Sequence, residues 1–451
     1  MSNERNGFSS RLGFVLATAG SAVGLGNIWR FPYLAAKYGG GTFLLTYLIL
    51  TLTFGFSLMI TEVALGRRAG TSAIRAFGHF NKKYTFIGYL TTLIPFIIFP
   101  YYCVIGGWVT KYALISIQGG IHDAASDTFF TGFISKSAEP MICVLVFLIV
   151  TTLVVAGGVK GGIERVSTIM MPVLIVLLIG VSVFCITRPG AMAGVAYYIK
   201  PNLKDFSPTT ILAALGQLFY SMSLAMGIMV TFGSYMPKKS NLEKSVTQVE
   251  IFDTGVAFLA GLMIVPAVFV FSNGDSSMLA KGPSLMFVML PKVFNSMVFS
   301  SIIAAVFFIL VLLAALTSSI SLLETLVAVL MDKFHMKRGT ACITMFIIAL
   351  LLAVPSSLGF GAWSNITIFG FDFLDFFDFI SNSVLMPIAA FLTCIFVGYI
   401  IKPKEIIDEV ESSGEFKRKP LFLVMVKYIA PICIVAILVF SVLEGLGFIT
   451  V

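Results

Sequence analysis

Residues 20–27 read Gly20-Ser21-Ala22-Val23-Gly24-Leu25-Gly26-Asn27, a run of small residues in the middle of the first long apolar segment. A second such run, residues 221–227, reads Ser221-Met222-Ser223-Leu224-Ala225-Met226-Gly227 and lies inside a later apolar segment. Glycine and serine weaken an α-helix, and backbone freed from a helix inside lipid needs protein or water partners. We therefore expect each run to break a membrane-spanning helix beside a polar cavity.

The composition is that of a membrane protein. Of the 451 residues, 58% are hydrophobic and 12% are charged, whereas charged residues make up about 25% of a typical soluble domain. The formal net charge is +8, but the basic residues lie in short runs between apolar segments and form no continuous patch. The composition excludes a water-soluble enzyme, argues against nucleic acid as a partner, and indicates a lipid bilayer.

Apolar runs of bilayer-spanning length recur along the chain, bounded by charged or Gly- and Pro-rich segments. They predict eleven transmembrane helices, at about 11–35, 41–66, 86–117, 140–157, 164–187, 209–236, 249–271, 297–331, 340–355, 373–400 and 421–447. A further apolar piece near 276–291 is short enough to be re-entrant or amphipathic. The expected fold class is an all-α membrane protein, with residues 1–451 in one transmembrane domain.

The basic residues set the expected orientation. With the N-terminus in the cytoplasm, 20 of the 30 lysines and arginines fall on the cytoplasmic side, which is the positive-inside arrangement. Eleven spans then put the C-terminus on the extracellular side of the cell (plasma) membrane.

The two interrupted spans are the first and the sixth, five spans apart. A repeat with an odd number of spans enters the membrane from the opposite side in its second copy, so two such units are inverted about an axis in the membrane plane. We therefore predict two inverted five-helix repeats, residues 11–187 and 209–400, followed by an additional eleventh helix at 421–447. The prediction depends on the matching breaks, because the halves share no evident residue-level identity.

The broken backbone offers ligands of both signs. Carbonyl oxygens freed at the end of one half-helix suit a hard cation such as sodium, and amides at the start of the next half-helix suit a carboxylate. An amino acid bound beside sodium fits that polarity. Glycines in membrane helices are also packing devices, and that alternative stays open for either break taken alone.

Several motifs carry a resemblance to a known family. They are Arg11-Leu12-Gly13, the run AVGLGNIWRFPY at 22–33, Gly39-Gly40-Gly41, Gln217-Leu218-Phe219-Tyr220-Ser221 and Leu316-Thr317-Ser318-Ser319. From Arg5 to about Tyr399 the chain resembles the neurotransmitter:sodium symporter family, and within it the bacterial carriers of hydrophobic, leucine-type amino acids. The resemblance implies a sodium-coupled symporter that takes up a neutral amino acid by alternating access.

The resemblance implies two sodium sites made of hard oxygen ligands with little charge. The first would use the Ala22 carbonyl and the side chains of Asn27, Ser221 and Asp253, together with a substrate carboxylate oxygen. The second would use the carbonyls of Gly20, Val23 and Ala314 and the hydroxyls of Thr317 and Ser318. Positions 314, 317 and 318 share one helical face by spacing, although hydroxyls in membrane helices also commonly bond to their own helix.

The resemblance also implies a substrate pocket between the two breaks. Tyr102 matches the tyrosine that donates its hydroxyl to the substrate carboxylate, and amides near Gly24, Leu25 and Gly26 would supply further donors. The side-chain pocket would be lined by Ser21, Ala22, Ile98, Tyr220, Ser221, Ser223, Ala225, Met226, Ser318 and Leu322. This mostly apolar lining, with a flexible methionine, favours an aliphatic or aromatic neutral amino acid.

Three positions bear on the substrate. Family members that carry amines have an aspartate at the position of Gly24, whereas amino-acid carriers have glycine, so Gly24 favours an amino acid. Tyr220 and Ala225 occupy places often held by phenylalanine and glycine. The choice among leucine-like, alanine-like and tryptophan-like substrates therefore stays open.

Asp253 is an ionisable residue at membrane depth, which makes it a functional candidate. Chloride-dependent relatives have asparagine at the matching position, and a chloride ion supplies the negative charge near the first sodium site. The fixed carboxylate of Asp253, with Tyr47, Gln217 and Ser221 around it, predicts chloride independence. One hypothesis is that Asp253 takes up a proton after sodium leaves; a simple helix-capping carboxylate is the alternative.

Other charged residues resemble the gates of the family. Arg30 and Asp378 match the extracellular pair, and Arg5 and Asp332 match the cytoplasmic pair. An exposed ion pair contributes only about 0–1 kcal/mol, which suits a contact that opens in every transport cycle. A purely orienting charge is the alternative for Arg5.

Two further buried acids, Glu62 and Glu324, are interpreted as structural hydrogen-bonding groups. We expect no catalytic residues, and sodium in two sites is the only cofactor predicted. The alternatives are a sodium-coupled amine or osmolyte symporter, a non-transporting amino-acid receptor, and a channel. The identity of the amino acid, the stoichiometry and the oligomeric state stay open.

Overall fold

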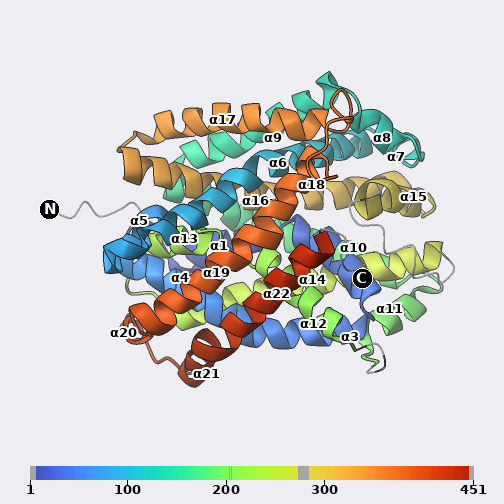
Figure 1. The fold of residues 1–451 in the computed structure, drawn as a ribbon. Coiled ribbons are helices and arrows are strands. Elements are labelled where there is room, and N and C mark those ends of the chain that lie inside the picture. The colour runs from blue at the N-terminus through green and yellow to red at the C-terminus, as the bar shows by residue number, and fades with distance from the viewer. Residues whose placement is uncertain (1–6, 203, 205, 273–283, 446–451) are drawn as a thin grey trace.

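The fold is an assembly of long helices, seen in a computed structural model that describes residues 7–202, 204, 206–272 and 284–445. Within those ranges, β-structure is limited to one isolated bridge between Ile368 and Phe371. The helices α6 (Thr85–Ile117), α9 (Ala138–Ala156), α16 (Ser300–Phe334) and α17 (Arg338–Leu358) pack side by side (Figure 1). The prediction of an all-α protein is confirmed.

Nine helical segments of the described chain are long and apolar enough to cross a membrane. They are Gly41–Ala69 (containing α3 and α4), Lys82–Ile117 (α6), Ala138–Ala156 (α9), Val159–Ile186 (containing α10), Leu242–Phe271 (α14), Ser300–Phe334 (α16), Arg338–Leu358 (α17), Phe373–Ile400 (containing α18 and α19) and Lys419–Gly445 (containing α21 and α22). A tenth is the bent pair Arg11–Ala22 (α1) and Gly26–Lys37 (containing α2). The remaining predicted span is divided into α12 (Pro208–Ser221) and α13 (Ile228–Tyr235). Each of the eleven predicted spans thus corresponds to a helix or a broken pair.

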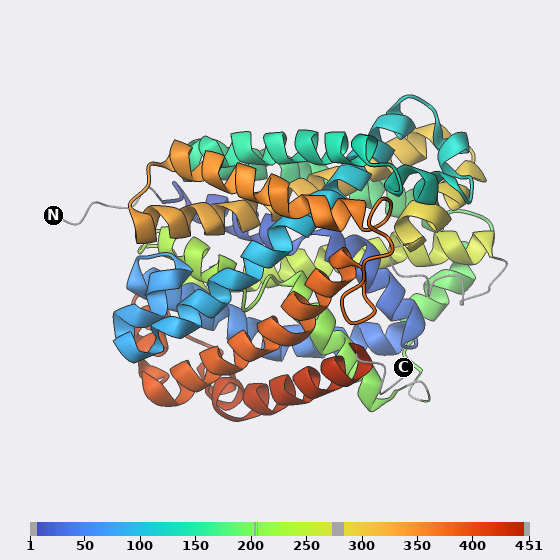
Figure 2. The ribbon, with the colours of Figure 1, turned by 45° about the horizontal axis from the view of Figure 1, so that its top comes forward.

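Short helices gather at the two ends of the long ones. At one end lie α5 (Ala73–Phe80), α20 (Lys404–Glu411) and α21 (Lys419–Val424), and at the other α7 (Ile121–Ala124), α8 (Phe129–Ile134), α11 (Ala191–Ile199) and α15 (Leu290–Asn295) (Figures 1 and 2). The apolar piece expected near 276–291 begins outside the described residues and continues as Leu285–Met289 and α15. The division into inverted repeats stays a prediction.

Glycines let α4 (Phe56–Ala69) and α13 touch through their backbones. A Cβ on Gly66 would lie 1.8 Å from the Val230 carbonyl oxygen, and one on Gly233 would lie 2.3 Å from the Val63 carbonyl oxygen. Small residues at a helix crossing permit this approach. The half-helix that follows the second small-residue run is therefore packed tightly on α4.

Gly66→Ala puts a methyl group where a backbone oxygen already lies. We expect a loss of about 1–3 kcal/mol of stability, as for other overpacked interiors, measured as a lower melting temperature in detergent. Gly216→Ala in α12 is the control, since no atom lies within 4 Å of a Cβ there, and it should keep or raise the melting temperature because alanine is the better helix former. An unchanged melting temperature for Gly66→Ala would show that the two backbones are not in contact.

Candidate functional site

The first break lies between the end of α1 at Ala22 and a π-helical turn that begins at Gly26. Val23 has extended backbone angles (φ −75°, ψ 93°), and the two halves of the span meet at 55°. A Cβ on Gly24 would lie 2.5 Å from the Ser318 hydroxyl oxygen. Glycine at this position thus lets the broken backbone approach α16.

The second break separates α12, which ends at Ser221, from α13, which begins at Ile228. Within it, Ser223 (φ 52°) and Ala225 (φ 61°) are left-handed, which costs a non-glycine residue about 1 kcal/mol or more. Glu62 Oε1 accepts a hydrogen bond from the Ala225 amide at 2.7 Å. This bond offsets part of the cost, so Glu62 has the structural hydrogen-bonding role that was predicted.

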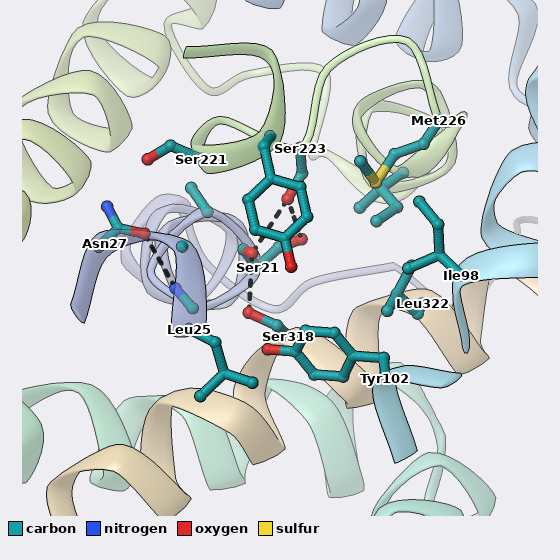
Figure 3. Close-up of a pocket in the computed structure, with 15 residues that line it drawn as sticks. Ser21, Leu25, Asn27, Ile98, Tyr102, Ser221, Ser223, Met226, Ser318 and Leu322 are labelled. Atoms are coloured by element: carbon teal, nitrogen blue, oxygen red, sulfur yellow. Dashed lines mark hydrogen bonds between the residues drawn. The ribbon is translucent and has the colours of Figure 1, made fainter. Parts of the chain in front are cut away.

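The two breaks face each other (Figure 3). The Ser21 hydroxyl donates to Ser223 Oγ at 3.3 Å, and the Ser223 hydroxyl is 3.0 Å from the Ser21 carbonyl oxygen. The Ser318 hydroxyl donates to the same carbonyl at 3.1 Å. The first span, the sixth span and α16 therefore meet at one backbone oxygen.

A small cavity of about 30 Å³ lies between the breaks (Figure 3). It is lined by Ser21, Ala22, Gly24, Leu25, Gly26, Asn27, Ile98, Tyr102, Tyr220, Ser221, Ser223, Met226, Ile228, Ser318 and Leu322. Every predicted substrate-binding residue is among them except Ala225, which is buried in the second break without lining the cavity. The cavity is therefore enclosed by residues of both breaks together with residues of α6 and α16.

The Tyr102 hydroxyl is a buried polar group that lies beside the Ser318 side chain and the Leu25 backbone, and it makes no hydrogen bond of standard geometry with the described part of the chain. Tyr102 is 4% exposed and projects from α6 beside Ser318 (Figure 3). A Cβ on Gly24 would lie 3.3 Å from the hydroxyl oxygen. A buried hydroxyl without a partner costs about 1–3 kcal/mol, so this group favours a ligand that brings an acceptor.

The five oxygens predicted for the second sodium site lie close together. Thr317 Oγ1 is 3.0 Å from the Ala314 carbonyl oxygen and 3.5 Å from that of Val23. Ser318 Oγ is 3.5 Å from the carbonyl oxygens of Gly20 and Val23. Two hydroxyls supply only two protons to these oxygens, so lone pairs are left for a cation.

Asp253 lies fully buried in α14 beside the first break. Its Oδ1 accepts from Asn27 Nδ2 at 2.7 Å and from the Ser221 hydroxyl at 2.8 Å, and its Oδ2 accepts from the Tyr47 hydroxyl at 3.2 Å. Ala22 lines the same cavity as Asn27 and Ser221. The residues predicted for the first sodium site are therefore neighbours.

Arg30 and Asp378 line a separate vestibule of about 260 Å³. Arg30 lies over the Tyr220 ring, 5.3 Å from its centroid. Asp378 Oδ1 accepts from the Tyr101 hydroxyl at 3.1 Å and from Asn382 Nδ2 at 2.7 Å. The side chains of Arg30 and Asp378 form no direct ion pair with each other in the described part of the chain.

Hydrogen bonds join several elements at the other end of the molecule. The Tyr235 hydroxyl donates to Glu324 Oε1 at 2.8 Å, consistent with the structural role predicted for Glu324. Asp332 Oδ2 accepts from the Ser72 amide at 2.7 Å. Its expected partner Arg5 lies outside the described residues, so the cytoplasmic pair stays a prediction.

Two contacts of buried acidic residues were not predicted from the sequence. The Glu164 carboxylate accepts from the Ser9 amide at 2.8 Å and from the Ser9 hydroxyl at 2.6 Å, and Arg338 forms an ion pair with Glu324. Both acids stand in or beside apolar segments, which marks them as candidates for such bonds. The sequence does not predict which residues bond to Glu164 and Glu324.

Two residues around the cavity have neighbours that the sequence did not predict. Gln217, expected beside Asp253, donates from Nε2 to the Gly26 carbonyl at 2.9 Å. Ile228 lines the cavity although it was not predicted to. Ile228 is the first residue of α13 after the second break. Its position directly after the small-residue run could have predicted that it lies beside the cavity.

The sequence profile described as the Sodium:neurotransmitter symporter family matches residues 5–131 and 131–446. The chain belongs to this family. It is 36% identical to the uncharacterized sodium-dependent transporter YhdH of Bacillus subtilis, over 95% of this chain and 96% of that protein. It is 24% identical to the human sodium- and chloride-dependent GABA transporter 2, over 98% of this chain and 80% of that protein.

A solved structure of the same family also matches the fold. The crystal structure of MhsT in complex with L-phenylalanine has a TM-score of 0.88 and 39% sequence identity, covering 97% of this chain and 100% of that chain. Family, relatives and fold agree that this symporter is a sodium-dependent, multi-pass membrane transporter.

Thr317→Val removes one hydroxyl from the oxygen cluster at nearly constant volume. Because one favourable oxygen contact contributes about 1–2 kcal/mol, we expect the sodium concentration for half-maximal thermal stabilisation to rise about tenfold. Thr325→Val is the matched control: Thr325 is equally buried in α16 and donates to the Ser321 carbonyl at 2.9 Å. Equal shifts in the two variants would refute the assignment of the cluster to sodium.

Proposed function

We propose that this symporter couples inward sodium movement to the uptake of a neutral, hydrophobic amino acid, independently of chloride. The observation that carries the proposal is the buried Tyr102 hydroxyl, which makes no hydrogen bond of standard geometry and lies between two helix breaks beside clustered oxygen atoms. A carboxylate bound there gives the hydroxyl an acceptor and also gives a neighbouring cation an anionic ligand. An α-amino acid supplies that carboxylate.

The space around Gly24 supports an amino acid over an amine. An aspartate there would begin with a Cβ 2.5 Å from the Ser318 hydroxyl oxygen, so the Ser318 side chain would have to shift to accommodate the amine-binding carboxylate of other members. The L-phenylalanine in the MhsT complex supports a hydrophobic side chain, as does the lining by Ile98, Met226 and Leu322. These three residues are apolar, and methionine adapts its shape easily.

Two sodium ions provide enough energy for concentrative uptake. In this proposal one binds at Ala22, Asn27, Ser221 and Asp253, and the other at Gly20, Val23, Ala314, Thr317 and Ser318. Each ion gains about 2.3 kcal/mol per 100 mV of membrane potential. Two ions therefore support a concentration ratio of roughly a thousandfold from voltage alone.

We place the N-terminus in the cytoplasm and the vestibule beside Arg30 on the outer side. Two features support alternating access from there: the vestibule of about 260 Å³ and the hydrogen-bonded closure around Tyr235 and Asp332 at the other end. Opening that closure, with Arg5 released from Asp332, would deliver substrate inward. Closing Arg30 onto Asp378 would seal the vestibule.

The direct test is uptake of radiolabelled amino acids into proteoliposomes. Accumulation should require an inward sodium gradient, should fail with potassium, and should be inhibited by hydrophobic amino acids. Inhibition by amines alone would support an amine carrier, and saturable binding without uptake would support a receptor. Flux that does not saturate would support a channel.

Tyr102→Phe removes the donor proposed for the substrate carboxylate. A hydrogen bond to a charged group contributes about 1.5–3 kcal/mol, so the dissociation constant of the amino acid should rise roughly 10- to 100-fold. Tyr112→Phe is the matched control, since Tyr112 lies in the same helix and donates to the Phe287 carbonyl at 2.7 Å. Unchanged binding by Tyr102→Phe would exclude this role.

Asp253→Asn removes the fixed negative charge beside the first sodium site. We expect the wild type to transport equally with chloride or gluconate, and the variant to need chloride, because an anion must then balance the sodium charge. The variant should also lose any pH dependence due to proton return by Asp253. Chloride-independent transport with an unaltered pH profile would contradict both roles.

A further inference from the structure

A crevice of about 760 Å³ opens where three helices begin on one face of the molecule. It is bordered by Arg11 at the start of α1, by the first two turns of α14, and by the loop that precedes α21. This face carries α20 and α21 (Figure 1) and is cytoplasmic in the proposed orientation. The crevice shares no residue with the amino-acid pocket or the vestibule.

Hydrogen bonds fix the walls of the crevice. The Glu243 carboxylate accepts from the backbone amides of Lys417 and Arg418 at 2.8 and 3.0 Å. The Arg418 guanidinium pairs with Glu250 at 3.0 Å and lies 3.4 Å from the centroid of the Phe56 ring. The loop is therefore tied to α14 and α4, and the crevice has a defined shape.

Positive charge dominates the lining. Four basic and two acidic side chains border the crevice, and Glu243 and Arg418 already have partners in its walls. Arg11, Lys244 and Lys417 are exposed and make no side-chain hydrogen bond or ion pair with the described ranges of the chain. Glu415 is the remaining acid, so the open crevice favours an anion.

Apolar side chains continue from the crevice along the membrane-facing surface. Lys244, Gln248 and Ile251 follow one another on a single face of α14 by their spacing of four and three residues. Ile251 is 63% exposed. Leu12, which follows Arg11 in the sequence, is 58% exposed. A basic crevice at the end of membrane helices beside exposed aliphatic residues matches a phosphate headgroup with its acyl chains.

We propose that this crevice binds the headgroup of an anionic phospholipid of the cytoplasmic leaflet. The phosphate lies among Arg11, Lys244 and Lys417, and an acyl chain lies along Leu12 and Ile251. The bound lipid then joins the start of the first span to α14 and to the last span. The inference goes beyond the proposed function and depends on it only for the orientation of this face.

The test measures the melting temperature of the purified protein in uncharged detergent against added phosphatidylglycerol, phosphatidylcholine or inorganic phosphate. Phosphatidylglycerol should stabilise the wild type saturably, and the other two should not. Each basic residue near an anionic lipid contributes about a fivefold change in affinity. The variant Arg11→Gln/Lys244→Gln/Lys417→Gln should therefore bind phosphatidylglycerol roughly a hundredfold more weakly, and Lys244→Gln alone about fivefold more weakly.

The matched control is Lys82→Gln/Lys83→Gln/Lys337→Gln, which removes the same charge from exposed positions on the same face outside the crevice. It should bind phosphatidylglycerol like the wild type. Equal weakening in both triple variants, or no weakening in either, would overturn the proposal. A saturable shift with inorganic phosphate that the crevice variant loses would also overturn it, by assigning the crevice to a soluble anion.

Two readouts keep this test separate from the transport proposal. Sodium-dependent thermal stabilisation of the crevice variants shows that they are folded. Lipid stabilisation needs no transport, so failure of amino-acid uptake leaves the lipid result valid, and failure of lipid binding leaves the uptake proposal intact.

Discussion

Backbone carbonyl groups that leave a helix inside a membrane must find partners in the protein, and this requirement organises the centre of the molecule. The Ser21 carbonyl receives hydroxyls from Ser223 and Ser318, and the Val23 carbonyl lies near Thr317 and Ser318. Each partner is itself an oxygen. The break is therefore stabilised by groups that keep spare lone pairs, and a hydrophobic bundle acquires an environment suited to an unhydrated monovalent cation.

The two ends of the molecule differ in the contacts that their polar side chains make. At one end Tyr235, Glu324, Asp332 and Ser72 form buried or partly buried hydrogen bonds, each contributing about 0.5–1.5 kcal/mol. At the other end Arg30 and Asp378 are engaged with separate partners across a vestibule. The first end is therefore joined directly by hydrogen bonds, whereas the side chains of Arg30 and Asp378 contact separate partners.

Local sequence rules predicted much of this architecture. Apolar length was enough to predict the spans, and runs of small residues were enough to predict the breaks. The spacing of Ala314, Thr317 and Ser318 placed three oxygens on one helical face. Their pairing with Gly20 and Val23, and the composition of the pocket, came from the family resemblance. Contacts between distant segments were not predictable in this way. The bond from Ala225 to Glu62 joins residues 163 positions apart, and the bond from Tyr101 to Asp378 joins residues 277 positions apart.

The bond between Glu62 and Ala225 has a mechanical consequence. Glu62 belongs to α4, and α4 touches α13 backbone to backbone at Gly66 and Gly233. Ala225, one of the two left-handed residues of the second break, is thus bonded to the same helix that packs against α13. A shift of α13 relative to α4 would therefore disturb the Ala225–Glu62 hydrogen bond and the two glycine contacts together.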